Sequence, residues 1–186
     1  GALWTREVIE RNRALSAPEM ERVVVAVDPP ASSGANADEC GIVVAGRGRD
    51  GRAYVLADWS EGGLSPRQWA GRAVEAYRAH DADVIVAERN QGGEMVGTTI
   101  ELVDDAALVK LVYASKSKER RAGPISLLYE KGDVSHCRVM PELEDQMRAF
   151  GTESQTGSPD RVDALVWAIT ELMLGAKAAP PRVRTF

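Results

Sequence analysis

Two runs of β-branched and small apolar residues each end in a single carboxylate, and this pattern constrains the fold more than any other feature. The first run spans residues 22–28 and ends at Asp28, directly before two prolines; the second spans residues 83–88 and ends at Glu88. Near-continuous apolar runs of this length are typical of buried strands. Open α/β sheets bind ligands beyond the carboxyl ends of their parallel strands. If these two strands lie side by side and parallel, Asp28 and Glu88 emerge at the same edge.

The remaining periodicity predicts an α/β fold with a mixed sheet. Strands at 22–28, 41–46 and 53–59 are joined by short loops, which indicates an antiparallel three-strand meander. Strands and helices then alternate, which favours parallel strands flanked by helices. Further strands are predicted at 83–88, 108–113 and 134–140. Helices are predicted within 1–20, from Ser65-Pro66 onward, and at 91–103, 125–130, 141–150 and 160–174.

Composition limits the number of domains and the class of protein. A chain of 186 residues with 44% apolar and 27% charged residues suits one globular core. Its two cysteines form no CxxC pattern, which fits a reducing cytoplasm, and no apolar run approaches the roughly 20 residues of a membrane span. We therefore expect one domain at 21–175. Residues 1–20 are expected to be a connecting remnant with a helix outside the core, and residues 176–186 a flexible tail.

A third source of acidic groups lies at the start of the last predicted helix. Asp160 and Asp163 are three residues apart, so they share one helix face, where the helix dipole favours negative charge. Considered one at a time, Asp28 has a simpler interpretation as a turn residue, and Asp160 has one as an N-cap or first-turn acid. Glu88 and Asp163 are harder to explain in this way, because each has strongly apolar neighbours.

Carboxylates from several elements that meet at one edge indicate metal-dependent phosphodiester cleavage. Two Mg²⁺ or Mn²⁺ ions about 4 Å apart can activate water and neutralise a phosphate, and hard cations prefer oxygen ligands. Without metal, the same carboxylates would raise one another's pKa. The sequence therefore predicts that Asp28, Glu88, Asp160 and Asp163 bind two such ions.

Basic residues follow the fifth predicted strand and the Glu88 position. Residues 114–124 are predicted to form a basic loop, which is either a solvated surface or a sequence-independent contact to DNA phosphates. Its place after a strand that should end near Glu88 favours DNA. The candidates for DNA binding are Lys116, Lys118, Arg120, Arg121, Arg89 and Asn90.

Four blocks of the sequence resemble the C-terminal nuclease domain of phage-type terminase large subunits, which has a ribonuclease H-like fold. The resemblance covers residues from about 20 to 175, and it is to the branch found in tailed phages, prophages and gene transfer agents. The blocks that carry it are Val24–Pro30, Asp38–Ile42, Ala87–Gly93 and Asp160–Ala168.

The resemblance implies a ribonuclease H-like mixed sheet, with Asp28 and Glu88 as metal ligands and a third ligand from the last helix. Many relatives carry adjacent aspartates there, whereas here Ser158-Pro159 precede Asp160 and Arg161 follows it. Both Asp160 and Asp163 therefore stay candidates for the third ligand.

The resemblance also implies an endonuclease that cuts double-stranded DNA, with little sequence preference, in the host cytoplasm at the prohead during genome packaging. The expected partners are an ATPase motor domain, the portal and the small terminase subunit. No GxxxxGK[ST] pattern occurs in the chain, so we expect the motor to lie elsewhere in a longer protein.

Two alternative functions stay open at the level of sequence. A Holliday-junction resolvase-like nuclease would share the acidic residues and would prefer junctions to linear duplex. A non-catalytic ribonuclease H-like nucleotide- or DNA-binding module would need a glycine-rich phosphate loop after the first strand. Asp28 is followed instead by Pro29-Pro30, which argues against that module.

Overall fold

The computed structural model describes residues 1–30, 39–89 and 93–175 of the chain. Within these ranges no helix is both long enough and apolar enough to cross a bilayer. The strands are β1 (Met20–Asp28), β2 (Gly41–Gly48), β3 (Ala53–Asp58), β4 (Val84–Glu88), β5 (Val109–Val112) and β6 (Val134–His136). The helices are α1 (Arg6–Arg11), α2 (Pro66–Ala79), α3 (Gly93–Val103), α4 (Lys118–Glu130), α5 (Pro141–Ala149) and α6 (Asp160–Met173).

The strands form one mixed sheet in the order β5-β4-β1-β2-β3-β6. β1, β2 and β3 are the antiparallel meander, while β4 joins β1, β5 joins β4 and β6 joins β3 in parallel. In the described part of the sheet, β2 alone therefore runs opposite to the others. The predicted ribonuclease H-like mixed sheet is confirmed, and the carboxyl ends of five strands lie at one edge.

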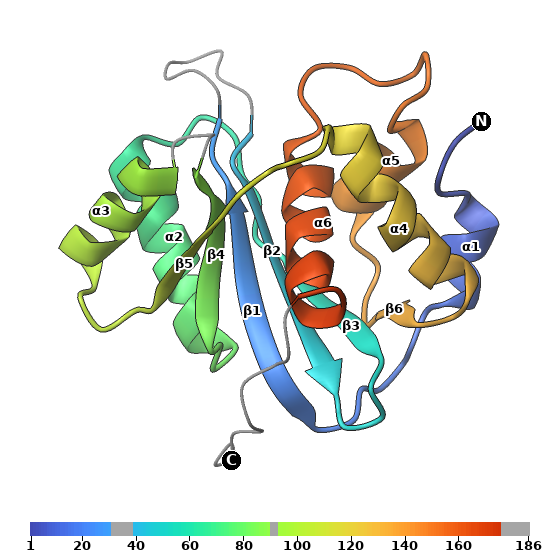
Figure 1. Ribbon diagram of the computed structural model, residues 1–186, viewed down its shortest axis with the longest axis horizontal. Helices are drawn as coiled ribbons and strands as arrows, with labels where there is room; N and C mark the ends of the chain where they lie inside the picture. The colour runs from blue at the N-terminus through green and yellow to red at the C-terminus, as the bar shows by residue number, and fades with distance from the viewer. Residues whose placement is uncertain (31–38, 90–92, 176–186) are drawn as a thin grey trace.

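Helices cover both faces of the sheet and enclose a separate apolar core on each (Figure 1). On one face, α2 and α3 pack on Val25 and Ile85. On the other face, α6 crosses β1 and β2, with α1, α4 and α5 packed around it. α6 is buried along nearly its whole length, which agrees with its apolar sequence.

The alternation of side chains along β1 and β4 decides where their terminal carboxylates point. Val24 of β1 and Val84 of β4 pair in register, and both belong to the core under α6. Because successive side chains point to opposite faces, every second residue of each strand faces α6. Asp28 and Glu88 have this parity and emerge on the α6 face.

A β-bulge in β3 directs a third terminal carboxylate to the same face. Val44 pairs with Ala57 but Ala45 pairs with Val55, so one extra residue is inserted in β3. An extra residue reverses the alternation beyond it. Asp58 therefore faces α6, whereas an unbroken strand would turn it toward α2.

The N-terminal segment is part of the core, and the expectation that it lies outside the core was wrong. Its helix is the short α1, and Trp4 and Ile9 are completely buried. Trp4 packs edge-on against Tyr129 and Phe150, with ring centroids 6.0 and 5.8 Å away. Burial of an indole this large outweighs the charged character of the surrounding sequence.

A buried polar network fastens the same segment to the domain. Arg13 donates to Glu144 at 2.5 and 2.9 Å. Oε2 of Glu144 also lies 2.9 Å from Nδ1 of His136, within hydrogen-bond distance. Nε2 of His136 lies 2.7 Å from the hydroxyl of Tyr129. Both ring nitrogens are thus used within the network, and His136 is a structural residue here.

Truncating Trp4 tests whether this segment stabilises the domain. Trp4→Ala should lower the free energy of unfolding by about 3–5 kcal/mol, because it removes a completely buried aromatic side chain and leaves a cavity. Chemical denaturation followed by circular dichroism measures this. Leu15→Ala is the control, since Leu15 is fully exposed and should change stability by less than about 0.5 kcal/mol. Equal effects of the two substitutions would contradict the packing described.

Candidate metal centre

Three strands that run to the same edge of the sheet end in a carboxylate: β1 in Asp28, β3 in Asp58 and β4 in Glu88. All three residues face α6, and Asp28 and Glu88 are buried. A buried carboxylate is costly unless it is paired or bound to a cation. The neighbours of each carboxylate on α6 and α4 therefore decide whether it forms an ion pair or is left to bind a cation.

The start of α6 is pressed directly against β2. A Cβ atom added to Gly41 would lie 2.0 Å from the carbonyl oxygen of Asp160, so only glycine permits this approach. Pro159 is the N-cap residue and makes no side-chain capping bond, and Asp160 is the first helical residue. Of the two simpler interpretations, Asp160 is therefore the first-turn acid and not the N-cap, and its Oδ1 accepts from the hydroxyl of Ser158 at 2.6 Å.

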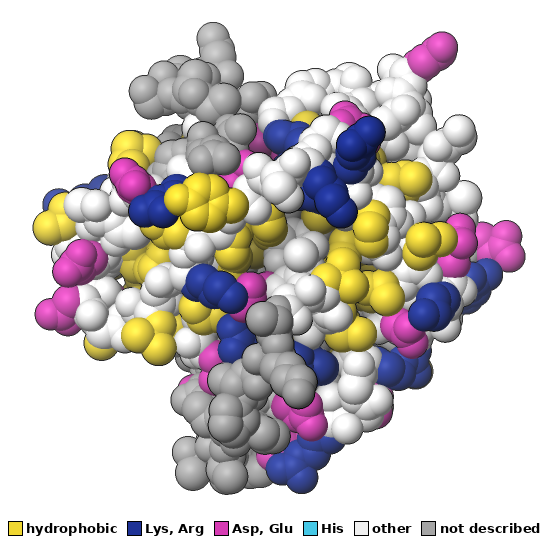
Figure 2. All heavy atoms as spheres, viewed as in Figure 1, with side chains coloured by type: hydrophobic (Ala, Val, Ile, Leu, Met, Phe, Trp, Pro, Cys, Tyr) yellow, Lys and Arg dark blue, Asp and Glu magenta, His cyan; other side chains and the backbone are white. Residues whose placement is uncertain are grey.

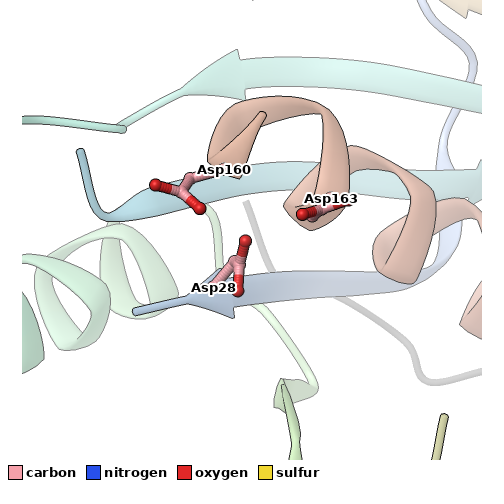
Figure 3. Close-up of side chains that lie close together, drawn as sticks. All are labelled: Asp28, Asp160 and Asp163. Carbon is pink, nitrogen blue, oxygen red and sulfur yellow. The ribbon is translucent and has the colours of Figure 1, made fainter. Parts of the chain in front are cut away.

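The carboxylates of Asp28, Asp160 and Asp163 converge. One oxygen from each lies within 4.8 Å of the others, and all three residues are buried. Figure 3 shows Asp160 and Asp163 on successive turns of α6, with the Asp28 side chain pointing up from β1 toward them. Residues that are far apart in sequence thus meet at a single point, as the sequence predicted for these three.

Burial and mutual repulsion disfavour the charged state of this cluster. Burial, together with the negative charges of Asp163 and Asp160, raises the pKa of Asp28 well above its usual range. Burial also raises the pKa of Asp163, although its ion pair with Lys118 opposes the change. Oδ2 of Asp28 is buried and accepts no hydrogen bond from the residues that the structure describes.

Two cations at the start of α4 partly balance this charge. Nζ of Lys118 lies 2.5 Å from Oδ2 of Asp163, and Nη1 of Arg121 lies 3.5 Å from Oε2 of Glu88. The guanidinium of Arg121 also stacks on Trp167 of α6 at 4.4 Å. Although burial opposes the charged form of Lys118, the bond to Asp163 and the nearby carboxylates raise its pKa.

The basic loop predicted at 114–124 is shorter than expected, and that part of the prediction was wrong. α4 begins at Lys118, capped by the side chain of Ser117, and continues through Pro124. A Gly-Pro pair usually indicates a helix boundary. Here the burial of Ala122 and Ile125 in the α6-side core holds the segment helical despite the proline.

The predicted site residues therefore separate into groups. Glu88 lies at the same edge as Asp28 but pairs with Arg121 and is not in the converging set. Lys118 and Arg121 face carboxylates, whereas Lys116 and Arg120 are exposed. Arg89 is exposed and donates to the hydroxyl of Tyr113 at 2.5 Å. Asn90 lies outside the described residues.

Arg161 was not predicted as a site residue, yet it fixes the end of α6 that carries Asp160. It is buried and donates to Glu39 at 2.6 and 3.0 Å and to Asp58 at 2.5 Å. These bonds connect α6 to the approach to β2 and to the end of β3. The signal in the sequence was an arginine between two acidic residues in an otherwise apolar helix.

The cluster fits a divalent cation on the chemistry of its donors. Its three converging groups are carboxylates, which are the ligands that Mg²⁺, Mn²⁺ and Ca²⁺ prefer, and Oδ2 of Asp28 lacks a donor in the described residues. A bound cation would satisfy that oxygen and remove the repulsion that raises the pKa of Asp28.

The chain is similar to phage terminase nucleases. The family described as "Terminase RNaseH-like domain" matches residues 25–172. The HK97 bacteriophage large terminase has a TM-score of 0.70 and 14% identity over 91% of this chain and 43% of that one, so the chain spans less than half of that protein. The nuclease domain of the large terminase subunit of bacterial virus Sf6 has a TM-score of 0.66 and 14% identity, covering 91% and 98%.

A third solved terminase nuclease is also similar to this chain in structure. The large terminase nuclease from thermophilic phage G20c with bound magnesium has a TM-score of 0.63 and 16% identity, covering 91% of this chain and 97% of that one. No curated protein matches the sequence. At these identities the solved structures show the shared fold.

Removing one carboxylate tests the charge balance without any metal. The pKa of Asp28 in the folded protein lies above its value near 4 in the unfolded chain. Stability is therefore lost as the pH rises from the unfolded pKa to the folded one, because Asp28 must ionise in the folded protein. Asp28→Asn should therefore raise the Tm in EDTA at pH 7.5, and the gain should vanish toward pH 4. A gain of about 2–4 °C would correspond to about 1 kcal/mol for a domain of this size.

The control for this experiment is Asp145→Asn, which removes an exposed carboxylate on α5. It should show no gain in Tm at pH 7.5. An Asp28→Asn protein that is less stable than the parent at pH 7.5 in EDTA would contradict the proposed repulsion.

Proposed function

Because the chain belongs to the terminase RNase H-like domain family, we propose that it is a divalent-metal-dependent endonuclease that cuts double-stranded DNA during viral genome packaging. The observation that carries the proposal is the convergence of Asp28, Asp160 and Asp163 at the carboxyl edge of the sheet. Open α/β sheets bind their ligands at this edge. Solved terminase nuclease domains from G20c and Sf6 are described with magnesium and with manganese, which supports the choice of cation.

Asp28, Asp160 and Asp163 would hold two Mg²⁺ or Mn²⁺ ions, and Glu88 would complete the ligand set from the neighbouring strand. Bound there, such ions would supply a water of lowered pKa and neutralise charge on the phosphate. Asp160 and Asp163 both face Asp28, so both are proposed as ligands. Lys118 and Arg121 keep the acidic groups in place from α4, and Arg161 fixes the start of α6.

DNA would reach this edge over the start of α4. Figure 2 shows Lys and Arg side chains gathered there on the viewed face, beside hydrophobic side chains. Lys116 and Arg120 line a cavity of about 230 Å³ with Tyr113 and Trp167, and Arg89 stacks on Tyr113 at 5.3 Å. Such cations contact phosphates and carry little sequence information, so cutting should show little sequence preference. Asn90 stays a candidate next to Arg89.

Family membership and the length of a relative support a proposal about the wider setting. The chain spans 43% of the HK97 large terminase, which leaves room for an ATPase motor domain in a longer protein. We propose that this domain works with such a motor, the portal and the small terminase subunit at the prohead in the host cytoplasm. A gene transfer agent is one setting in which this packaging would occur.

Substitutions at the acidic edge test the activity. Asp28→Asn and Asp163→Asn should lower Mn²⁺-dependent nicking of supercoiled plasmid by at least about 100-fold, the scale of loss for a group that stabilises developing charge. Glu88→Gln should lower it comparably if Glu88 is a ligand, and by about 10-fold if Glu88 only positions Arg121. Agarose electrophoresis of plasmid forms over time gives the rates.

Asp145→Asn serves again as the control and should nick at the parent rate. Retained secondary structure by circular dichroism shows that a loss is not unfolding. Full activity of both Asp28→Asn and Glu88→Gln would refute the proposed centre. Preferred cutting of four-way junctions over linear duplex would point to a resolvase-like nuclease instead.

A further inference from the structure

A second, basic cleft opens at the other end of the same sheet edge. It has a volume of about 450 Å³ and lies between the end of β3, helix α2 and the connection from β6 to α5. It exists because β6 is short: its pairing with β3 ends at Val55 and His136, so the last residues of β3 have no β6 partner. Three arginines line it against two carboxylates, and the side chains important to its chemistry are Asp58, Trp59, Arg72, His80, Arg138, Glu142 and Arg161.

The three arginines of this cleft differ in whether a carboxylate pairs with them. Arg161 is paired with Glu39 and Asp58. Arg72 forms an ion pair with Glu61 at 3.6 Å and donates to the carbonyl of Trp59 at 2.5 Å, and its guanidinium lies over the indole ring. Arg138 is exposed, and no carboxylate of the described residues lies within ion-pair distance of it. Arg138 therefore presents a cation that forms no ion pair with the described residues, although Glu142 lines the same cleft.

Trp59 and His80 line the cleft beside Arg138 and hold each other in place. Nε1 of Trp59 donates to Nε2 of His80 at 3.2 Å, and the two rings pack edge-on at 6.0 Å. Burial, with a smaller contribution from Arg138, lowers the pKa of His80, so the ring stays a neutral acceptor for Trp59 at pH 7. The cleft is thus lined by an indole and a neutral imidazole, together with the cations Arg72 and Arg138.

The cleft and the acidic cluster share one wall. Arg161 lines the cleft and directly follows Asp160 in α6, while Asp58 joins the two through its ion pair. β6 lies three strands from β1, which is about 14 Å at the usual spacing of about 4.8 Å. That span corresponds to about four base pairs of B-form rise. Lys116 and Arg120 lie at the start of α4, beside Tyr113, which follows β5, and Trp167 of α6.

We infer that this cleft is a phosphate-binding subsite for the DNA backbone, with Arg138 as its main contact and Arg72 as the supporting cation. The inference rests on the proposed nuclease function and extends it to the path of the substrate. DNA crosses the whole carboxyl edge, held at one end by the start of α4 and at the other by Arg138. The acidic cluster lies between the two basic ends, where a phosphate is held for cutting.

Binding measurements on an uncleaving parent test the subsite. Asp28→Asn protein is titrated onto a fluorescent 30-base-pair duplex in Ca²⁺ at several NaCl concentrations, and anisotropy gives Kd. Adding Arg138→Ala should weaken binding several-fold and lower the slope of log Kd against log [NaCl] by about 0.9, because one phosphate contact is lost. Arg138→Lys should restore most of the slope, since it restores the charge.

The matched control is Arg49→Ala in the same parent. Arg49 is also an exposed arginine, but it lies in the β2–β3 hairpin at the opposite edge of the sheet, so Kd and slope should stay unchanged. If Arg138→Ala leaves both values unchanged, the subsite is refuted and the cleft would suit a protein carboxylate instead. If the Asp28→Asn parent binds no duplex, the proposed function and the subsite both fall.

Discussion

Mutual repulsion among three buried carboxylates is the constraint around which the rest of the domain is built. Asp28, Asp160 and Asp163 are brought within 4.8 Å of one another in a region with little access to water. Such an arrangement is unfavourable unless cations balance it. Lys118 supplies part of that balance, and Oδ2 of Asp28 accepts no hydrogen bond from the residues that the structure describes.

Holding the cluster together requires several features that have no catalytic chemistry of their own. Gly41 lets the first turn of α6 approach β2 at backbone distance. The bulge in β3 turns Asp58 toward α6. Arg161 donates to Asp58 and to Glu39, and these bonds fix the first turn of α6. An error of one residue in the register of β3 would turn Asp58 toward α2, because side chains alternate between faces.

Much of the architecture could be read from local patterns. The meander, the parallel strands and the long apolar α6 follow from periodicity and turn residues, and the structure confirms the mixed sheet. The prediction failed where tertiary packing overrode local signals. Trp4 is buried in a segment rich in charge, and α4 continues through Gly123-Pro124 because its apolar side chains pack against the core.

The sequence by itself determined which carboxylates stand at strand ends and at the start of α6, because strand alternation and helix periodicity are local properties of the chain. Only the tertiary structure decided which of them meet. It placed Asp160 and Asp163 opposite Asp28, paired Glu88 with Arg121, and brought Lys118, a predicted DNA contact, to Asp163. Contacts between residues more than 100 positions apart depend on how strands are ordered and how closely α6 approaches β2, and no local pattern encodes those distances.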